Sequence, residues 1–136
     1  MKQILFIFFV IFPLIGFSQN TLSIRVNNVE SAKGKVNVAV YDSDEAFLSF
    51  DHVLKSDSVA AHKGSVELNI SDLPEGEYAL AVFHDENDNG KLDTNWLGIP
   101  KEKVAFSKGK MKTFGPPKFK ECAFTMNSDH EIHIDL

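Results

Sequence analysis

The chain has almost no cysteine, and this limits how it can be stabilised. Cys122 is the single cysteine among 136 residues, so an intrachain disulfide is excluded. A small domain without disulfides relies on its apolar core, and a bound metal is a second means of stabilisation. Cys122 lies in an apolar run with Phe124 and Met126, which predicts a strand. These surroundings favour a buried structural thiol over a nucleophile.

Basic residues are also in deficit. The chain carries 14 Lys and Arg against 19 Asp and Glu, which gives a formal net charge of −5. Nucleic acid and anionic membrane surfaces repel an acidic protein, so this balance argues against both as partners. The excess of carboxylates suits calcium, and it equally suits plain solubility.

Long apolar runs are absent except at the N-terminus. There, Lys2 precedes an apolar run over residues 4–17 that Pro13 interrupts. The run is shorter than the ~20 residues that a helix needs to cross a bilayer, which argues against a membrane anchor. A basic residue followed by a short apolar run is typical of a secretory signal peptide.

Small residues mark the end of this signal. Gly16 and Ser18 occupy the −3 and −1 positions of a cleavage site before Gln19. We therefore predict a signal peptide over residues 1–18 and one domain over residues 19–136. The protein is then exported, either periplasmic or secreted, and keeps no stable membrane anchor after cleavage.

Helical periodicity is scarce, whereas period-two alternation is common. The only helix candidate is residues 44–50, with Ser43 as its N-cap. Residues 78–83 are apolar on both faces, which predicts a central strand covered on both sides. Residues 55–62 are a weaker strand candidate. Apolar and polar residues alternate in four further segments, namely residues 22–26, 36–40, 66–70 and 132–136.

Alternation of this kind indicates strands with one buried and one solvated face. Several short strands separated by turns predict an all-β fold, specifically an antiparallel β-sandwich of the Ig-like or prealbumin-like type. At most one short helix is expected. A long irregular segment, residues 85–119, is rich in Gly and Pro, and such segments are usually functional or held by a ligand.

Oxygen-bearing side chains alternate at the start of this segment, and a glycine follows them. This is the spacing of a calcium loop, where alternate residues turn their oxygens toward one centre and glycine makes the bend. The alternative is a polar turn that forms without a bound ion. We predict Ca²⁺ as the cofactor. The expected ligands are the side chains of Asp85, Asn87, Asn89 and Asp93 and the backbone carbonyl of Lys91.

The loop departs from the helical calcium-binding pattern at its twelfth position. Trp96 stands where a bidentate glutamate is usual, so water or a remote acid such as Glu102 must complete the ligand set. Few carboxylates predict weak affinity, on the order of 10⁻⁴ to 10⁻³ M, as in extracellular modules. Magnesium fits less well because it demands a tight octahedron.

Aromatic residues gather in the same irregular segment. They form either a ligand platform or a small core that packs the segment onto the sandwich, and packing is the preferred interpretation. If a ligand docks here, the expected surface includes Trp96, Glu102 and His84. Its ligand would be an unknown protein or a carbohydrate. The aromatic residues are Trp96, Phe106, Phe114 and Phe119.

Several motifs in order carry a resemblance to a known family. They are residues 78–87, residues 89–93, Gly98-Ile99-Pro100-Lys101-Glu102, Phe106-Ser107 and residues 115–119. From about Gly34 to Phe124 the chain resembles the bacterial family called domain of unknown function 2141. The resemblance implies a short exported protein with one β-rich domain and no established activity.

The resemblance also assigns positions. The family's acidic loop corresponds to Asp85, Asn87, Asn89 and Asp93, and its Pro-Glu pair to Pro100 and Glu102. Cys122 stands where a small residue such as alanine is expected, which supports its burial.

Residues 73–78 are similar to the turn and strand of transthyretin-like, prealbumin-type modules, which supports the fold more than a function. The first hypothesis is therefore a calcium-stabilised binding or structural module. The alternative is a transthyretin-like hydrolase or isomerase acting on a small molecule. That activity needs a His with an acid, and only His84 with Asp85 or Glu102 is available.

Overall fold

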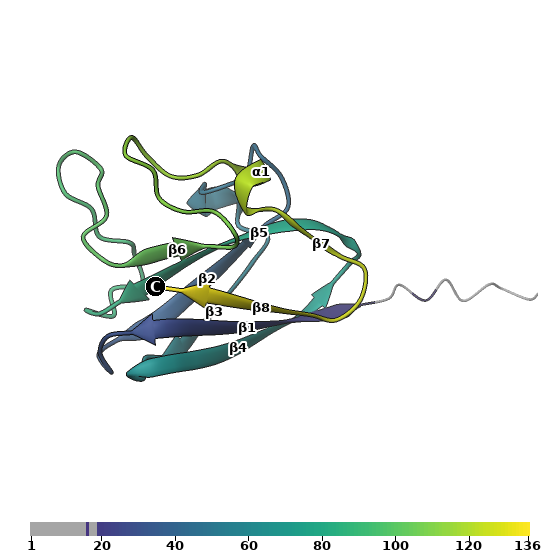
Figure 1. Cartoon of the computed structure of the whole chain (residues 1–136), viewed down its shortest axis with the longest axis horizontal. Helices are drawn as coiled ribbons and strands as arrows, with labels where there is room; N and C mark the ends of the chain where they lie inside the picture. Colours follow the sequence, from purple (N-terminus) through teal and green to yellow (C-terminus); the bar gives the residue numbers. More distant parts are fainter. Residues whose placement is uncertain (1–15, 17–18) are drawn as a thin grey trace, which may run out of the picture.

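The computed structural model describes residue 16 and residues 19–136 (Figure 1). The predicted signal peptide lies outside the described residues, apart from Gly16. None of the described helices is long and apolar enough to cross a membrane. The described elements are β1 (Asn20–Val29), β2 (Lys35–Tyr41), η1 (Phe50–His52), β3 (Lys55–Ala60), β4 (Gly64–Leu73), β5 (Gly76–Asp85), β6 (Val104–Phe106), α1 (Phe119–Cys122), β7 (Phe124–Met126) and β8 (His130–Asp135).

The strands form two sheets, which confirms the predicted all-β sandwich (Figure 1). One sheet has the order β4-β1-β8, and the other has the order β3-β2-β5-β6 with β7 also paired to β5. All pairs are antiparallel except β1 with β8, which are parallel. The chain reaches β8 only after building the second sheet, and such a crossover permits a parallel pair.

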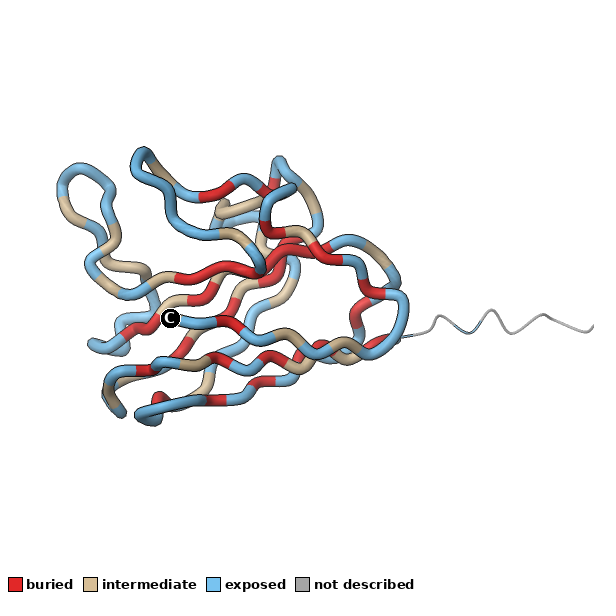
Figure 2. Tube along the Cα trace, viewed as in Figure 1, coloured by how far each residue is buried: buried red, intermediate tan, exposed pale blue. Residues whose placement is uncertain are grey.

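The main core lies between the sheets. Figure 2 shows buried positions alternating along the long strands, as the period-two pattern predicted. Burying a large aliphatic side chain stabilises a fold by about 1.5–3 kcal/mol, so this layer supplies most of the stability. Its fully buried members include Leu22, Ile24 and Val26 of β1, Val36, Val38 and Val40 of β2, and Leu80 and Val82 of β5.

A second apolar cluster covers the outer face of the five-stranded sheet. Tyr41, Phe106, Phe119 and Cys122 are buried in it. Phe47 joins them at the centre, with edge-to-face contacts to Tyr41 (5.4 Å between ring centroids), Phe119 (5.9 Å) and Phe106 (6.3 Å). The central strand β5 is therefore covered on both faces over most of its length, as predicted.

The helix predicted at residues 44–50 is wrong. The Ser43 hydroxyl accepts a hydrogen bond from the Ala46 N–H (3.3 Å), so the predicted cap exists. Only one α-type backbone bond follows, from Phe47 N–H to the Ser43 carbonyl (3.1 Å). Leu48 then takes a positive φ of 62°, which ends right-handed helical geometry, while Phe47 packs in the aromatic cluster.

The one α-helix among the described residues lies elsewhere, at α1. The irregular segment also contains a strand, β6, that the sequence did not predict. α1 ends at Cys122, so this residue is helical and not in a strand, although Phe124 and Met126 do form β7. Strand β6 has only three residues, and short strands leave little periodic signal.

Both sheets and both apolar clusters lie within residues 20–136. We therefore expect residues 19–136 to fold on their own.

Candidate functional site

The loop after β5 is built on one buried carboxylate. Asp85 ends β5 and is 0% exposed. Its two carboxylate oxygens accept hydrogen bonds from the N–H groups of Asn89 (3.1 Å) and Gly90 (2.7 Å). These bonds bend the chain back over the strand end, and Gly90 makes the bend with a φ of +74°. A buried carboxylate thus fixes the start of the irregular segment.

The other expected calcium ligands converge on the same loop. Asn87 Nδ2 donates to Asp93 Oδ2 (2.6 Å), and Asn89 Nδ2 donates to Asp93 Oδ1 (3.0 Å). Asn87 Oδ1 accepts from the Asn89 N–H (3.2 Å), and Asn89 Oδ1 accepts from the Lys91 N–H (2.9 Å). The side chains of Asp85, Asn87, Asn89 and Asp93 therefore belong to one connected network.

The donor set of this network is mixed. Among the described residues, no three His, Cys, Asp and Glu side chains are grouped so as to hold a metal ion. The loop's potential ligands also include amide and carbonyl oxygens, which calcium accepts readily. Rotating an Asn amide by 180° exchanges its nitrogen and oxygen, so each amide can present an acceptor to a cation.

Glu102 approaches the same loop from the far end of the segment. Its Oε2 accepts a hydrogen bond from the Asp93 N–H (3.0 Å), and Lys101 N–H donates to the Asp93 carbonyl (2.8 Å). The structure thus brings Glu102 beside Asp93, where the sequence left it only as a remote candidate. Trp96, at the twelfth loop position, lies between them in the chain and supplies no oxygen.

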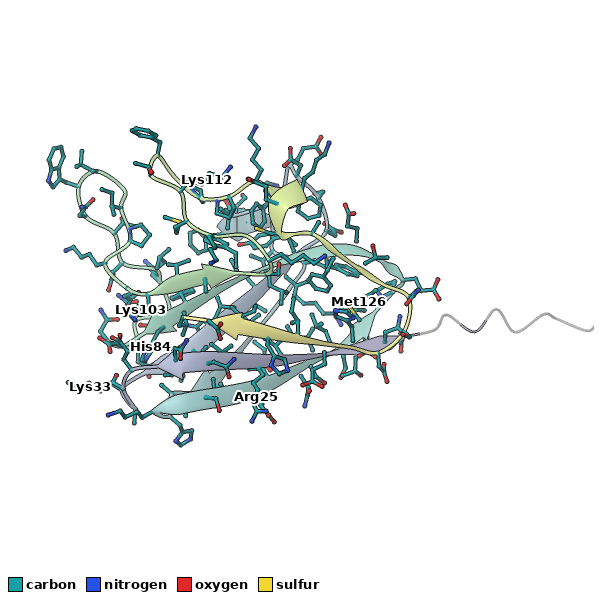
Figure 3. All side chains as sticks on the ribbon, in the orientation of Figure 1. Arg25, Lys33, His84, Lys103, Lys112 and Met126 are labelled. Carbon is teal, nitrogen blue, oxygen red and sulfur yellow. The ribbon has the colours of Figure 1, made fainter. Side chains whose placement is uncertain are left out.

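His84 lies in a cavity and not on an open surface. It is 3% exposed, and its Nε2 donates to the Lys33 carbonyl (2.8 Å; Figure 3). Among the described residues, no hydrogen bond joins His84 to Asp85 or Glu102. The cavity has a volume of about 240 Å³, and its lining includes Glu30, Glu86, Glu102, Lys101 and Lys103.

Two charged residues that line this cavity, Lys103 and Glu30, form an ion pair. The Lys103 ammonium bonds to the Glu30 carboxylate, and this hydrogen bond lowers the Glu30 pKa below its usual value. The hydrolase hypothesis required His84 to work with a nearby acid. Instead, His84 Nε2 bonds to the backbone carbonyl of Lys33, which is a structural contact.

The aromatic residues of the irregular segment divide into two pairs. Phe106 and Phe119 are buried in the outer cluster, so the packing interpretation is correct for them. It is wrong for Trp96, which is 90% exposed, and for Phe114, which is 100% exposed. Both lie in turns, which are closed by the bonds from Gly98 N–H to the Asn95 carbonyl and from Lys112 N–H to the Gly115 carbonyl.

An apolar hollow lies between two loops, and the sequence did not predict it. We name residues 86–103 the first loop and residues 107–118 the second loop. The floor of the hollow is the outer face of the sheet, with alternate residues of β2, β5 and β6. Its volume is about 200 Å³, and its floor includes Ala39, Ala81, Phe83, Val104 and Phe106.

The walls of the hollow come from the loops. Leu92 and Pro100 of the first loop face Met111 and Pro116 of the second loop, and Phe50 closes a third side. The only signal in the sequence was the apolar outer face of residues 78–83. It indicated that other residues pack on this face of the sheet, but not that a hollow remains between them.

Cys122 is a structural thiol. It is fully buried, and burial raises its pKa above the usual value for a thiol. Ser107, equally buried, accepts from the Leu80 N–H (2.8 Å) and donates to the Cys122 carbonyl (2.7 Å), which ties α1 to the sheet. The predicted burial of Cys122 is confirmed.

Taken together, the fold defines a small β-sandwich domain with a polar loop at one strand end and an apolar hollow between two loops. The chain belongs to the family described as uncharacterized protein conserved in bacteria (DUF2141), which matches residues 24–134. The resemblance seen in the sequence is therefore confirmed and extends further in both directions. No curated protein matches the chain significantly. No solved structure does so either.

Proposed function

We propose that this protein is an exported, non-catalytic binding module whose loop at residues 85–93 binds Ca²⁺. The ion orders the first loop, and the first loop forms one wall of the apolar hollow. The observation that carries the proposal is the connected network of Asp85, Asn87, Asn89 and Asp93 at the base of that loop.

Calcium would act here through charge and geometry. Two carboxylates, two amides and a backbone carbonyl are hard oxygen ligands of the kind that calcium takes. Glu102 already bonds to the Asp93 backbone, so an ion at Asp93 would also tie the far end of the first loop to its start. An ion that binds only the folded loop stabilises the fold by mass action.

The binding surface would be the hollow with its two loops. Ligand sites are concave and mainly apolar, and they are often formed by loops on a rigid scaffold. Trp96 and Phe114 belong to the two loops and are exposed, and aromatic side chains contribute strongly to the energetics of interfaces. Without the ion, we expect the first loop to lose its fixed position.

Thermal unfolding of residues 19–136 tests the proposal. We expect millimolar calcium to raise the melting temperature by several degrees relative to a chelator, and magnesium to do so much less. Equal melting temperatures under the three conditions would refute a metal site at this loop.

A substitution that adds a ligand charge should strengthen the effect. Asn87→Asp adds a carboxylate to the ligand set, so we expect calcium affinity to rise on the order of tenfold. The same change places a like charge beside Asp93 and should lower stability in chelator. Asn69→Asp, on the exposed face of β4, adds the same charge far from the loop and serves as the control. A calcium response that is unchanged in Asn87→Asp, or equally raised in Asn69→Asp, would contradict the proposal.

A further inference from the structure

We propose that the two loops dock the protein on an anionic lipid bilayer, with Trp96 and Phe114 entering the interface and the surrounding lysines contacting the lipid headgroups. This inference rests on the proposed function, because it names the partner of the binding surface and needs the first loop in its ordered position. It concerns reversible docking of the folded domain, which differs from the membrane anchor that the sequence argued against.

Charge is strongly segregated along this acidic chain. Residues 101–120 contain seven lysines and one glutamate, a formal charge of +6, whereas the whole chain carries −5. The negative net charge of the chain therefore includes a basic region at residues 101–120. The argument from net charge against anionic surfaces does not apply to this region. Attraction to a charged surface depends on local charge within about 8–10 Å, which is the screening length at moderate salt.

The basic side chains of the second loop are free to reach a surface. Lys108 and Lys110 are exposed, and among the described residues neither forms an ion pair. Lys112 forms an ion pair with Glu121 (2.7 Å), so these two opposite charges cancel. Lys112 lies on the opposite side of the sandwich from Arg25 of the three-stranded sheet (Figure 3). Lys101 and Lys103 lie apart from the second loop, beside the cavity of His84.

Trp96 is held at the corner of a tight turn. The Gly98 N–H donates to the Asn95 carbonyl (2.9 Å), and Gly98 takes a φ of +78°. The Asn95 side chain accepts from the N–H groups of Leu97 (2.9 Å) and Ile99 (3.0 Å). These bonds present the Trp96, Leu97 and Ile99 side chains outward, and all three are exposed.

Phe114 is presented in a similar way. The Lys112 N–H donates to the Gly115 carbonyl (2.8 Å), which closes a turn that includes Phe114 in its backbone. Met111 precedes this turn and is also exposed. Fixed turns lower the entropy lost when these side chains insert, because their backbone is already ordered.

The two tips face the same way. Both loops border the apolar hollow, and Figure 1 shows both projecting on the side of the sheet that carries α1. The result is two loops with exposed apolar tips. The second loop carries exposed lysines, whereas the first loop carries four acidic residues and three lysines.

This arrangement fits a bilayer better than a protein. A protein partner needs a continuous complementary face, whereas these apolar side chains stand on separate, fully exposed tips. Tryptophan and other aromatic side chains favour the membrane interface, where the ring is buried and nearby lysines extend to the headgroups. Clusters of lysine near a surface also bind anionic lipid directly.

Co-sedimentation with vesicles tests the proposal, using residues 19–136 so that the apolar N-terminal run is left out. In calcium, we expect binding to vesicles of phosphatidylglycerol and phosphatidylcholine, but not to phosphatidylcholine alone. Binding should weaken at high salt, and Trp96→Ala with Phe114→Ala should lower the apparent affinity roughly tenfold or more.

Charge is tested with a matched pair of variants. Lys108→Gln with Lys110→Gln should lower the affinity about tenfold or more, because each lysine near an anionic surface contributes roughly fivefold. Lys33→Gln with Lys63→Gln removes the same charge from exposed turns outside the two loops and should have little effect. Equal losses in the two pairs would overturn the proposal.

Other outcomes separate this inference from the proposed function. A calcium-dependent rise in melting temperature with no vesicle binding overturns the docking inference alone. Vesicle binding that persists in chelator, with no calcium effect on melting, supports docking and refutes the calcium site. Self-association of residues 19–136 that Trp96→Ala abolishes, without vesicle binding, would make a second copy the occupant and overturn the lipid proposal.

Discussion

Replacing Gly34 with alanine should destabilise the protein by about 4 kcal/mol or more, at the upper end of single substitutions. A Cβ at this position would lie 1.9 Å from the Asp85 carbonyl oxygen and 2.9 Å from the Glu86 carbonyl carbon. Both are backbone atoms, so the end of β5 must move. Gly34 also has a φ of +67°, which adds strain for any other residue. Urea unfolding in chelator measures the loss.

A second glycine provides the matched control. Gly98 has a similar φ of +78°, but no atom lies within 4 Å of the position its Cβ would take. Gly98→Ala should therefore cost only the backbone strain, about 1–2 kcal/mol. Similar losses in the two variants would show that the close approach of Gly34 to Asp85 is not a real constraint.

Asp85→Ala should lower stability by about 3–5 kcal/mol in chelator and should also abolish the calcium response. Its carboxylate is fully buried and accepts two backbone N–H bonds. Hydrogen bonds to charged groups contribute about 1.5–3 kcal/mol each, and the substitution leaves both donors without their acceptor. Unfolding curves with calcium and with chelator measure both effects in one experiment.

Asp88→Asn is the control for this second substitution. Asp88 lies in the same loop, is exposed, and forms an ion pair with Lys35 (3.4 Å). Exposed pairs contribute about 0–1 kcal/mol, and asparagine tolerates the positive φ of 55° at this position. We expect a small loss and a retained calcium response. A calcium response that survives in Asp85→Ala would move the site away from this carboxylate.

The fold could be predicted because its signals are local. Alternation in β1, β2, β4 and β8 follows directly from one buried face per strand, and the apolar β5 follows from burial on both faces. The polar loop was also visible, because its side chains bond mainly to neighbours within six residues. Such features leave a pattern in a short stretch of sequence, even though the strands themselves pair over long range.

Features that depend on tertiary contacts were missed or wrong. Residues 44–50 have helical propensity, but Phe47 packs with Tyr41 and Phe119 from other elements, and Leu48 breaks the turn. Trp96 and Phe114 match Phe106 and Phe119 in chemistry, so composition cannot tell which pair is buried. The apolar hollow exists only where two loops meet a sheet face. No single segment carries its pattern.

Amide hydrogen exchange on residues 19–136, with calcium and with chelator, tests the central claim most directly. If calcium orders the first loop, amides of residues 86–103 should exchange about tenfold more slowly with the ion, whereas those of β1 and β4 should not change. Magnesium should give little protection. Equal exchange of residues 86–103 in calcium and in chelator would contradict the account and leave the loop as a polar turn.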